Sequence, residues 1–333
     1  MEGVTPLLVA VVLLAVVFDY INGFHDTANA IATSVATRAL HPRQAIVMAA
    51  AFNFIGAFAG TAVARTIGSG LVQEETTTQA VVIAALLGAI AWNLVTWSLG
   101  LPSSSSHALI GGLLGATLVA SGTGALKVGG IVAKVLIPMV VSPLLGFAGA
   151  FGLMLAIYWI FRKASRRPLG RFFRRAQVLS AGFMAFSHGS NDAQKTMGVI
   201  TLALFSAGVI PDVSVPVWVI VVSATALSLG TAIGGWRIMA TMGRRVADLE
   251  PVHGFAAETT SATILFATAQ FGIPVSTTHV ISSAIMGVGS SRGPRGVRWN
   301  VAGTILVAWV VTIPAAAGMA ALAWIVLHLV GLG

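Results

Sequence analysis

The sequence predicts an all-α polytopic membrane protein built from two inverted-topology repeats of about five spans each, with interrupted or re-entrant helices. Three observations support this fold class. The 333 residues are 56% hydrophobic and only 9% charged, whereas about a quarter of an ordinary soluble domain is charged. The few charges are separated by uncharged stretches of membrane length. Two polar motifs occur twice in the same order, once in each half.

The uncharged stretches are the candidate spans, because each exceeds the roughly 20 residues with which a helix crosses the hydrocarbon layer. They cover residues 44–64, 76–126, 135–161, 213–236, 259–291 and 299–333. The first 24 residues start with an acidic residue and lead into a polar motif, unlike a signal peptide. We expect them to form a retained first span. The absence of cysteine excludes disulfides and thiol chemistry.

Positive charge gathers on one predicted side of the membrane. Seven lysines and arginines lie within residues 162–176. With three further loops on the same side they make up 15 of the 19 in the chain, and these loops lie near residues 38–43, 237–250 and 290–299. Short cytoplasmic loops are enriched in such residues. We therefore expect the 162–176 loop to be cytoplasmic and both termini to lie outside. The expected location is the plasma membrane, which is the cell inner membrane where a cell has two membranes. The net charge of +9 then needs no nucleic acid partner.

The internal repeat divides the chain in two. Residues 23–26 (GFHD) align with 189–192 (GSND) at an offset of 166, and residues 100–107 (GLPSSSSH) align with 272–279 (GIPVSTTH) at an offset of 172. An odd number of crossings per half gives the copies opposite orientations. Inverted repeats of this kind are typical of secondary transporters, whose sites lie near the membrane midplane at interrupted helices.

The predicted division is an N-terminal membrane repeat at 1–161, the basic loop at 162–176 and a C-terminal inverted repeat at 177–333. We expect helix interruptions within residues 5–37 and 177–209, because both segments are too long for one straight span and contain glycine and polar residues.

Asp26 and Asp192 lie within apolar segments, where an ionised carboxylate costs at least roughly 2.5–3.5 kcal/mol and persists mainly when it is paired or faces water. Amide oxygens accompany them at Asn29 and Asn191. Such oxygen ligands suit a hard cation, so the Asp pair is a candidate sodium site. The alternative is that each Asp caps a helix break.

Three further titratable residues accompany the pair. His25 can pass a proton near neutral pH, or it can be a structural hydrogen-bonding group. Lys195 follows Asp192 by three residues and can offset its charge on one helix face. Glu258 is an acid in an apolar stretch and a candidate coupling carboxylate, whereas the corresponding region of the first half, around Leu86, has no acid.

Two hydroxyl clusters, residues 103–106 and 276–278, each follow a proline and precede an apolar run, as at the start of a helix. A helix start presents free N–H groups and a positive dipole end, which together bind phosphate-like anions. Ordinary N-capping is the alternative for each cluster. Two copies at membrane depth favour an anion site.

The sequence resembles the inorganic phosphate transporter (PiT) family over nearly its whole length, most of all the bacterial low-affinity phosphate carriers. The resemblance is carried by the strings NGFHDTANAIAT (22–33), GLPSSSSHALIGG (100–112), AFSHGSNDAQKTMG (185–198), GFAAETTSA (254–262) and GIPVSTTHVISSAIMGVG (272–289).

This resemblance implies symport of phosphate, often as a neutral metal-phosphate complex, with protons. Relatives with Asn at the position of His25 include sodium symporters, so the coupling ion is a proton or sodium. It also implies a homodimer with an elevator-like movement and no cofactor. The residues implied around the anion are Ser104, Ser105, Ser106, Ser276, Thr277 and Thr278. Those implied for cations are Asp26, Asn29, Asn191 and Asp192.

Other functions fit the sequence less well. Sulfate transport is a close alternative, because sulfate permeases share the fold and both ions are tetrahedral. An enzyme would need a nucleophile and a base, but the adjacent Ser106 and His107 do not face each other on a helix. A passive anion channel would ignore a cation gradient.

Overall fold

A computed structural model describes residues 5–73 and 76–332. Over these residues the chain is helical, apart from turns, short extended segments and two isolated β-bridges. The predicted all-α class is confirmed.

The first half contains α1 (Pro6–Ala36), α2 (Pro42–Gly56), α3 (Ala62–Ser69), α4 (Gln79–Leu99), α5 (Ser105–Ser121), α6 (Val128–Ile131) and α7 (Ile137–Ile160). The second half contains α8 (Arg166–Ser206), α9 (Val217–Ile233), α10 (Trp236–Ala240), α11 (Pro251–Gln270), α12 (Thr277–Ser290) and α13 (Trp299–Leu329). Short π-helical segments, Val132–Leu136 and Thr241–Arg245, follow α6 and α10.

Several of these helices can cross a membrane. In the described part of the chain, four helical segments are long and apolar enough: Pro6–Ala36, Gln79–Leu99, Val128–Ile160 and Trp299–Leu329. The segments Val217–Ile233 and Trp236–Arg245 add a fifth span if their 61° bend is counted within one crossing.

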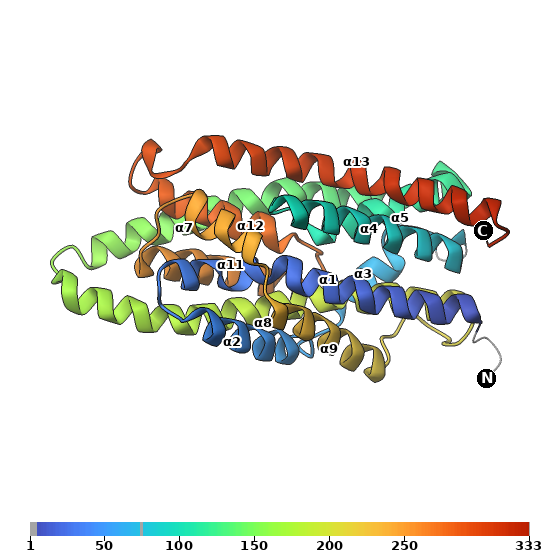
Figure 1. Cartoon of the computed structure of the whole chain (residues 1–333), viewed down its shortest axis with the longest axis horizontal. Coiled ribbons are helices and arrows are strands. Elements are labelled where there is room, and N and C mark those ends of the chain that lie inside the picture. The colour runs from blue at the N-terminus through green and yellow to red at the C-terminus, as the bar shows by residue number, and fades with distance from the viewer. Residues whose placement is uncertain (1–4, 74–75, 333) are drawn as a thin grey trace.

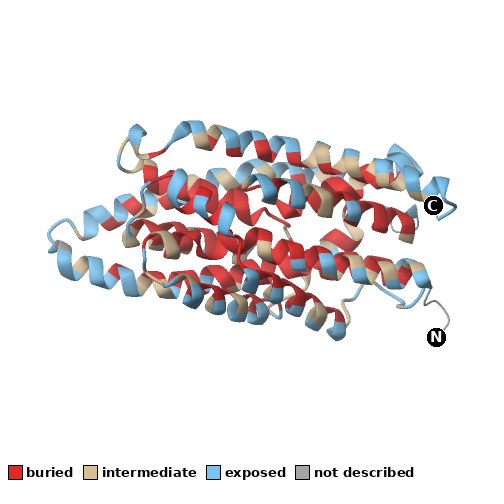
Figure 2. Cartoon of the chain, in the orientation of Figure 1, coloured by how far each residue is buried: buried red, intermediate tan, exposed pale blue. Residues whose placement is uncertain are grey.

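Exposed residues lie along the outside of the bundle and buried ones in its interior (Figure 2). The exposed surface carries many large apolar side chains, and the interior holds many polar residues. On α13, Val310 is 71% exposed and Leu322 66%, whereas Asp192 and Lys195 are at most 1% exposed. Large exposed apolar surfaces are rare on soluble monomers and mark contact with lipid or a partner. The chain is a multi-pass membrane protein.

The two halves run in opposite directions. α1 begins at the end of the molecule where α13 finishes, and α8 returns from the opposite end (Figure 1). The pair α4 and α5 occupies the end that holds both termini, whereas α11 and α12 lie toward the other end (Figure 1). These directions agree with the prediction of inverted repeats.

Both acidic motifs lie in unbroken helices, contrary to the interruptions predicted within 5–37 and 177–209. α1 continues through Asp26 and α8 through Asp192. Neither stretch holds a proline next to its motif, and other helices supply partners for the polar side chains. The backbone hydrogen bonds therefore stay intact, and the alternative in which each Asp caps a break does not apply.

The interruptions lie at the hydroxyl motifs instead. Gly100 after α4 and Gly272 after α11 both adopt the left-handed conformation with φ near 66°, which glycine tolerates without steric cost. Pro102 and Pro274 then prevent the helix from continuing, and α5 and α12 start afresh. The pairs α4–α5 and α11–α12 thus form two helical hairpins, in each of which the two helices pack against each other.

The predicted basic loop is mostly helical. A turn connects α7 and α8 only up to Ser165, which is the N-cap of α8, and the remaining residues to 176 belong to that helix. Pro168 does not prevent this, because proline is tolerated in the first turn. The 41-residue α8 therefore extends from the basic end of the molecule through the acidic motif.

Several helix pairs approach each other closely at glycines. An added Cβ atom at Gly23 would lie 2.3 Å from the carbonyl oxygen of Leu227, and one at Gly115 would lie 2.3 Å from that of Ala317. The equivalent glycines of the second half make equivalent contacts. The pairs related by the repeat are α1–α9 at Gly23, α2–α8 at Gly189, α5–α13 at Gly115 and α7–α12 at Gly287.

Candidate functional site

The starts of α5 and α12 meet in the interior of the bundle. The rings of His107 and His279 pack with centroids 4.6 Å apart, and His279 stacks on Trp309 of α13 at 4.0 Å. Both histidines are 1% exposed. The two hydroxyl motifs, 172 residues apart in sequence, therefore lie next to each other.

In the first copy, His25 connects the acid to the hydroxyl motif. Its Nδ1 lies 2.6 Å from Asp26 Oδ1, and its Nε2 lies 3.0 Å from Thr96 Oγ1. The hydroxyls of Ser103 and Ser105 lie 3.4 and 3.5 Å from the ring nitrogens. The second carboxylate oxygen of Asp26 is buried and accepts no hydrogen bond from the described residues.

In the second copy, Asp192 is surrounded by donors. Lys195 Nζ lies 2.6 Å from Asp192 Oδ1. Asn22 Nδ2 donates to Oδ2 at 3.3 Å, and Asn191 Nδ2 donates to Oδ1 at 3.2 Å. Asn191 also donates to the carbonyl of Val275 at 3.0 Å, which ties the acidic motif to the second hairpin.

Each acidic motif also contacts the hydroxyl motif of the other half. Asn29 Nδ2 donates to Thr278 Oγ1 at 2.8 Å and to Thr277 Oγ1 at 3.2 Å. In the reverse direction the Lys195 ammonium donates to Ser106 Oγ. Four of the six predicted hydroxyl residues, Ser105, Ser106, Thr277 and Thr278, thus contact acidic-motif residues, whereas Ser104 and Ser276 do not. These four hydroxyls and the acidic-motif residues are all buried and make up the buried network.

Asp26 and Asp192 come together with His188. Each offers one ligand atom, and these atoms lie within 4.8 Å of one another. His188 Nε2 lies 3.6 Å from Asp192 Oδ2. The amide oxygens of Asn22 and Asn191 are buried and accept no hydrogen bond from the described residues. Two carboxylates with free amide oxygens have the chemistry of a cation site.

His188 is the residue of this cluster that the sequence did not single out. The sequence does contain a signal for His188, which is its position in the internal repeat. The offset of 166 that aligns the acidic motifs also aligns Asn22 with His188 and His25 with Asn191. Each copy thus holds one histidine and one asparagine, in exchanged positions.

The first residue of each hydroxyl trio caps a helix. Ser104 accepts a hydrogen bond from the N–H of His107 at 3.2 Å, and Ser276 accepts one from the N–H of His279 at 3.2 Å. The capping alternative therefore holds for these two residues. The remaining first-turn N–H groups of α5 and α12 have no intrahelical partner, so both helix starts can still donate to an anion.

Glu258 makes a separate cluster. Thr33 and Ser180 donate to its two oxygens at 2.5 Å each, and Gln177 Nε2 donates to Oε1 at 3.1 Å. The residue is fully buried. Thr33 lies two helical turns beyond Asp26 on α1, so Glu258 belongs to the interior on the side of the basic end.

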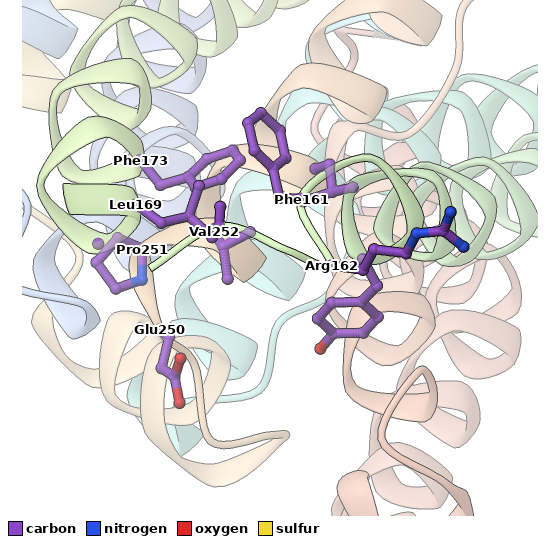
Figure 3. A pocket seen from close by; sticks show the side chains of 11 residues that line it. Phe161, Arg162, Leu169, Phe173, Glu250, Pro251 and Val252 are labelled. Atoms are coloured by element: carbon purple, nitrogen blue, oxygen red, sulfur yellow. The ribbon is translucent and has the colours of Figure 1, made fainter. Parts of the chain in front are cut away.

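A pocket of about 490 Å³ lies at the basic end and is not lined by any predicted site residue. Its wall combines aromatic and aliphatic side chains with Arg162 and Glu250, where the turn after α7 faces the start of α11 (Figure 3).

Comparison with known proteins identifies the relatives of the chain. A family model described as the phosphate transporter family matches residues 22–169 and again residues 162–320, one match in each half. A probable low-affinity inorganic phosphate transporter of Bacillus subtilis (strain 168) is 46% identical over 99% of this chain and 100% of its own length. A protein of the same description from Rhizobium meliloti (strain 1021) is 48% identical over 98% of each chain.

A solved structure shares the fold. It is described as the sodium-dependent phosphate transporter, and it matches with a TM-score of 0.89 and 26% sequence identity over 98% of this chain and 100% of that one.

Proposed function

This chain belongs to the phosphate transporter family, and on that premise we propose that it is a secondary active symporter, which moves inorganic phosphate together with a proton or a sodium ion. Its relatives are transporters, so the chain is not an enzyme. The observation that supports the proposal most is the meeting of two hydroxyl-rich helix starts with Asp26 and Asp192 in one buried region.

The anion is held by both hairpins in this proposal. The starts of α5 and α12 offer N–H groups and positive dipole ends. The hydroxyls of Ser105, Ser106, Thr277 and Thr278 add neutral donors, while Ser104 and Ser276 fix the geometry of the helix starts. Neutral donors bind phosphate without the tight ion pairing that would slow its release.

The coupling cation is held beside the anion. Asp26 and Asp192, with the amide oxygens of Asn29 and Asn191, are the ligands for sodium if sodium is the coupling ion. His25 is the group that carries a proton if the proton is the coupling ion, because its ring contacts both Asp26 and the hydroxyls of the first hairpin. The same oxygens suit the metal of a neutral metal-phosphate complex.

Glu258 is proposed as a second coupling carboxylate. It is buried, and its three donors come from α1 and α8, the two helices that also hold the acidic motifs. A proton that leaves the Asp26 cluster toward the basic end would meet this carboxylate next.

The orientation and assembly belong to the same proposal. The positive end, with residues 162–176, faces the cytoplasm, and both termini face outside. The apolar outer surface described above leaves room for a homodimer within the bilayer.

Uptake by proteoliposomes tests the proposal. The purified full-length chain should accumulate labelled phosphate under an inward proton gradient or an inward sodium gradient, and the two gradients applied separately identify the coupling ion. Absence of uptake under either gradient contradicts the proposal. Equal flux with and without a gradient indicates a channel. The relatives are described as phosphate transporters and lend no support to sulfate, so excess sulfate should leave uptake unchanged.

Two substitutions locate the anion. Ser105→Ala and Thr278→Ala each remove one hydroxyl from a charged ligand, a loss of about 1.5–3 kcal/mol, and should raise the KM for phosphate by at least about tenfold. Thr225→Ala is the matched control, because Thr225 is exposed and donates only to the Val221 carbonyl of its own helix. A KM unchanged by both site substitutions would place the anion elsewhere.

A further inference from the structure

One contact of the buried network occurs twice with different chemistry. Asn29 and Lys195 occupy equivalent positions of the acidic motifs, at the offset of 166. Their partners, Thr278 and Ser106, occupy equivalent positions of the hydroxyl motifs, at the offset of 172. In both cases a side-chain nitrogen from one half donates to the hydroxyl of the other half. One copy uses a neutral amide, and the other uses an ammonium group.

The ammonium group also bonds the acid of its own motif. Lys195 Nζ lies 2.6 Å from Asp192 Oδ1, and the side chain is 1% exposed. In the first copy, Asn29 is not within hydrogen-bonding distance of Asp26, and one Asp26 oxygen accepts no hydrogen bond from the described residues. In the second copy, an ammonium group of the protein therefore bonds both a carboxylate and a hydroxyl. In the first copy, a neutral amide bonds only the hydroxyls.

We propose that Lys195 is a tethered cation, whose ammonium takes in the second copy the position that an exchangeable monovalent cation takes in the first. An ammonium group and a sodium ion both carry one positive charge and both bind carboxylate and hydroxyl oxygens. The ammonium group stays attached to α8, so it offsets the charge of Asp192 in every step of the transport cycle. Of the cations in the site, only the one beside Asp26 then exchanges with solution.

This inference rests on the proposed symport. It also sharpens it, because the presence of Lys195 then determines how many cations move with the phosphate ion. The other charged and titratable groups near Lys195 include Asp19, Asp26, His107, His188 and Asp192, all buried. Lys195 supplies the basic side chain of this buried group. Its replacement by a neutral side chain therefore leaves the negative charge of the acids without the positive charge of the ammonium. A small mobile cation can restore it only if oxygen ligands are available.

Lys195→Asn and Lys195→Met separate this role from a structural ion pair. The asparagine variant copies Asn29 of the first half and offers an amide oxygen, whereas the methionine variant keeps the length of the side chain and offers no oxygen ligand. Uptake of labelled phosphate by proteoliposomes is measured at constant pH while sodium replaces potassium. We expect both variants to lose at least about tenfold in sodium-free medium, because each leaves a buried carboxylate without its partner.

Added sodium should restore the asparagine variant and not the methionine variant. The sodium dependence of the asparagine variant should also be steeper than that of the unmodified chain, by one binding site. Full activity of the asparagine variant without sodium would overturn the proposal. Failure of sodium to restore it, when size-exclusion chromatography shows a folded protein, would overturn it as well.

Sodium binding can be measured without transport. A ligand that binds only the folded state raises the unfolding temperature, so the difference between the unfolding temperatures in sodium and in potassium reports the site in the detergent-purified full chain. This difference should be larger by several degrees for Lys195→Asn than for the unmodified chain or for Lys195→Met. Equal differences in all three proteins would overturn the tethered cation. If the unmodified chain transports no phosphate, the symport proposal fails, and this measurement still decides the role of Lys195.

Discussion

The two halves of the molecule share their backbone features and differ in their charges. Gly100 and Pro102 recur as Gly272 and Pro274, and each half ends its first hairpin helix in the same left-handed turn. Asp26 and His107 also recur, as Asp192 and His279, but the residues around the acids do not. At the offset of 166, Asn22 aligns with His188, His25 with Asn191 and Asn29 with Lys195. The two halves thus share their backbone geometry and differ in the titratable side chains placed on it.

The largest difference between the halves should appear when the two acids are neutralised. Asp192→Asn leaves the Lys195 ammonium buried without its partner, a loss of about 3–5 kcal/mol of folding free energy. Asp26→Asn leaves His25 beside a neutral amide and should cost only about 1–3 kcal/mol. Unfolding of both full-length variants in mixed micelles measures the difference.

Both substitutions should also abolish concentrative phosphate uptake, because each removes a proposed cation ligand. Equal losses of stability would show that the two acids have equivalent surroundings. Full gradient-driven uptake by both variants would refute the cation assignment.

The next difference concerns Glu258, whose counterpart in the first half is Leu86. Glu258→Gln keeps one acceptor oxygen for a hydroxyl of Thr33 or Ser180 and offers an NH2 donor to the other hydroxyl, but it cannot carry a proton. We expect net gradient-driven uptake to fall by about tenfold, as for loss of one proton-transfer group, while exchange of internal for external phosphate continues. Parallel net-uptake and exchange assays on the same vesicles separate the two steps. Unchanged net uptake would reduce Glu258 to a structural role.

The smallest effect should be the same in both halves. Ser104→Ala and Ser276→Ala each remove the side-chain cap of a hairpin helix and should cost about 1 kcal/mol. Ser98→Ala serves as the control, because Ser98 is exposed and donates only to the Val95 carbonyl of its own helix. Clearly unequal losses from the two caps, measured by unfolding, would indicate that one of these serines has a further partner in the folded protein.

The sequence allowed prediction of the features that depend on local chemistry. Gly-x-Pro followed by hydroxyl residues is sufficient to start a new helix, and the arginine distribution is sufficient to group the ends of the spans. The burial of both acids follows from their apolar surroundings.

The features that depend on distant partners could not be predicted. Asn22 meets Asp192 across 170 residues, and His188 joins the cluster only when α1 and α8 lie side by side. For the same reason the unbroken course of both helices was missed, since their polar side chains are satisfied by other parts of the chain.

The glycine contacts set how closely the helices pack. At α1–α9, α2–α8, α5–α13 and α7–α12 the two backbones leave no room for a side chain between them, so these pairs are packed more tightly than crossings with larger residues. The contact from Asn29 to Thr278 connects the α1–α9 pair to the α7–α12 pair, and that from Lys195 to Ser106 connects the α2–α8 pair to the α5–α13 pair. Backbone contact thus holds the helices within a pair together, while polar side chains connect one pair to the next.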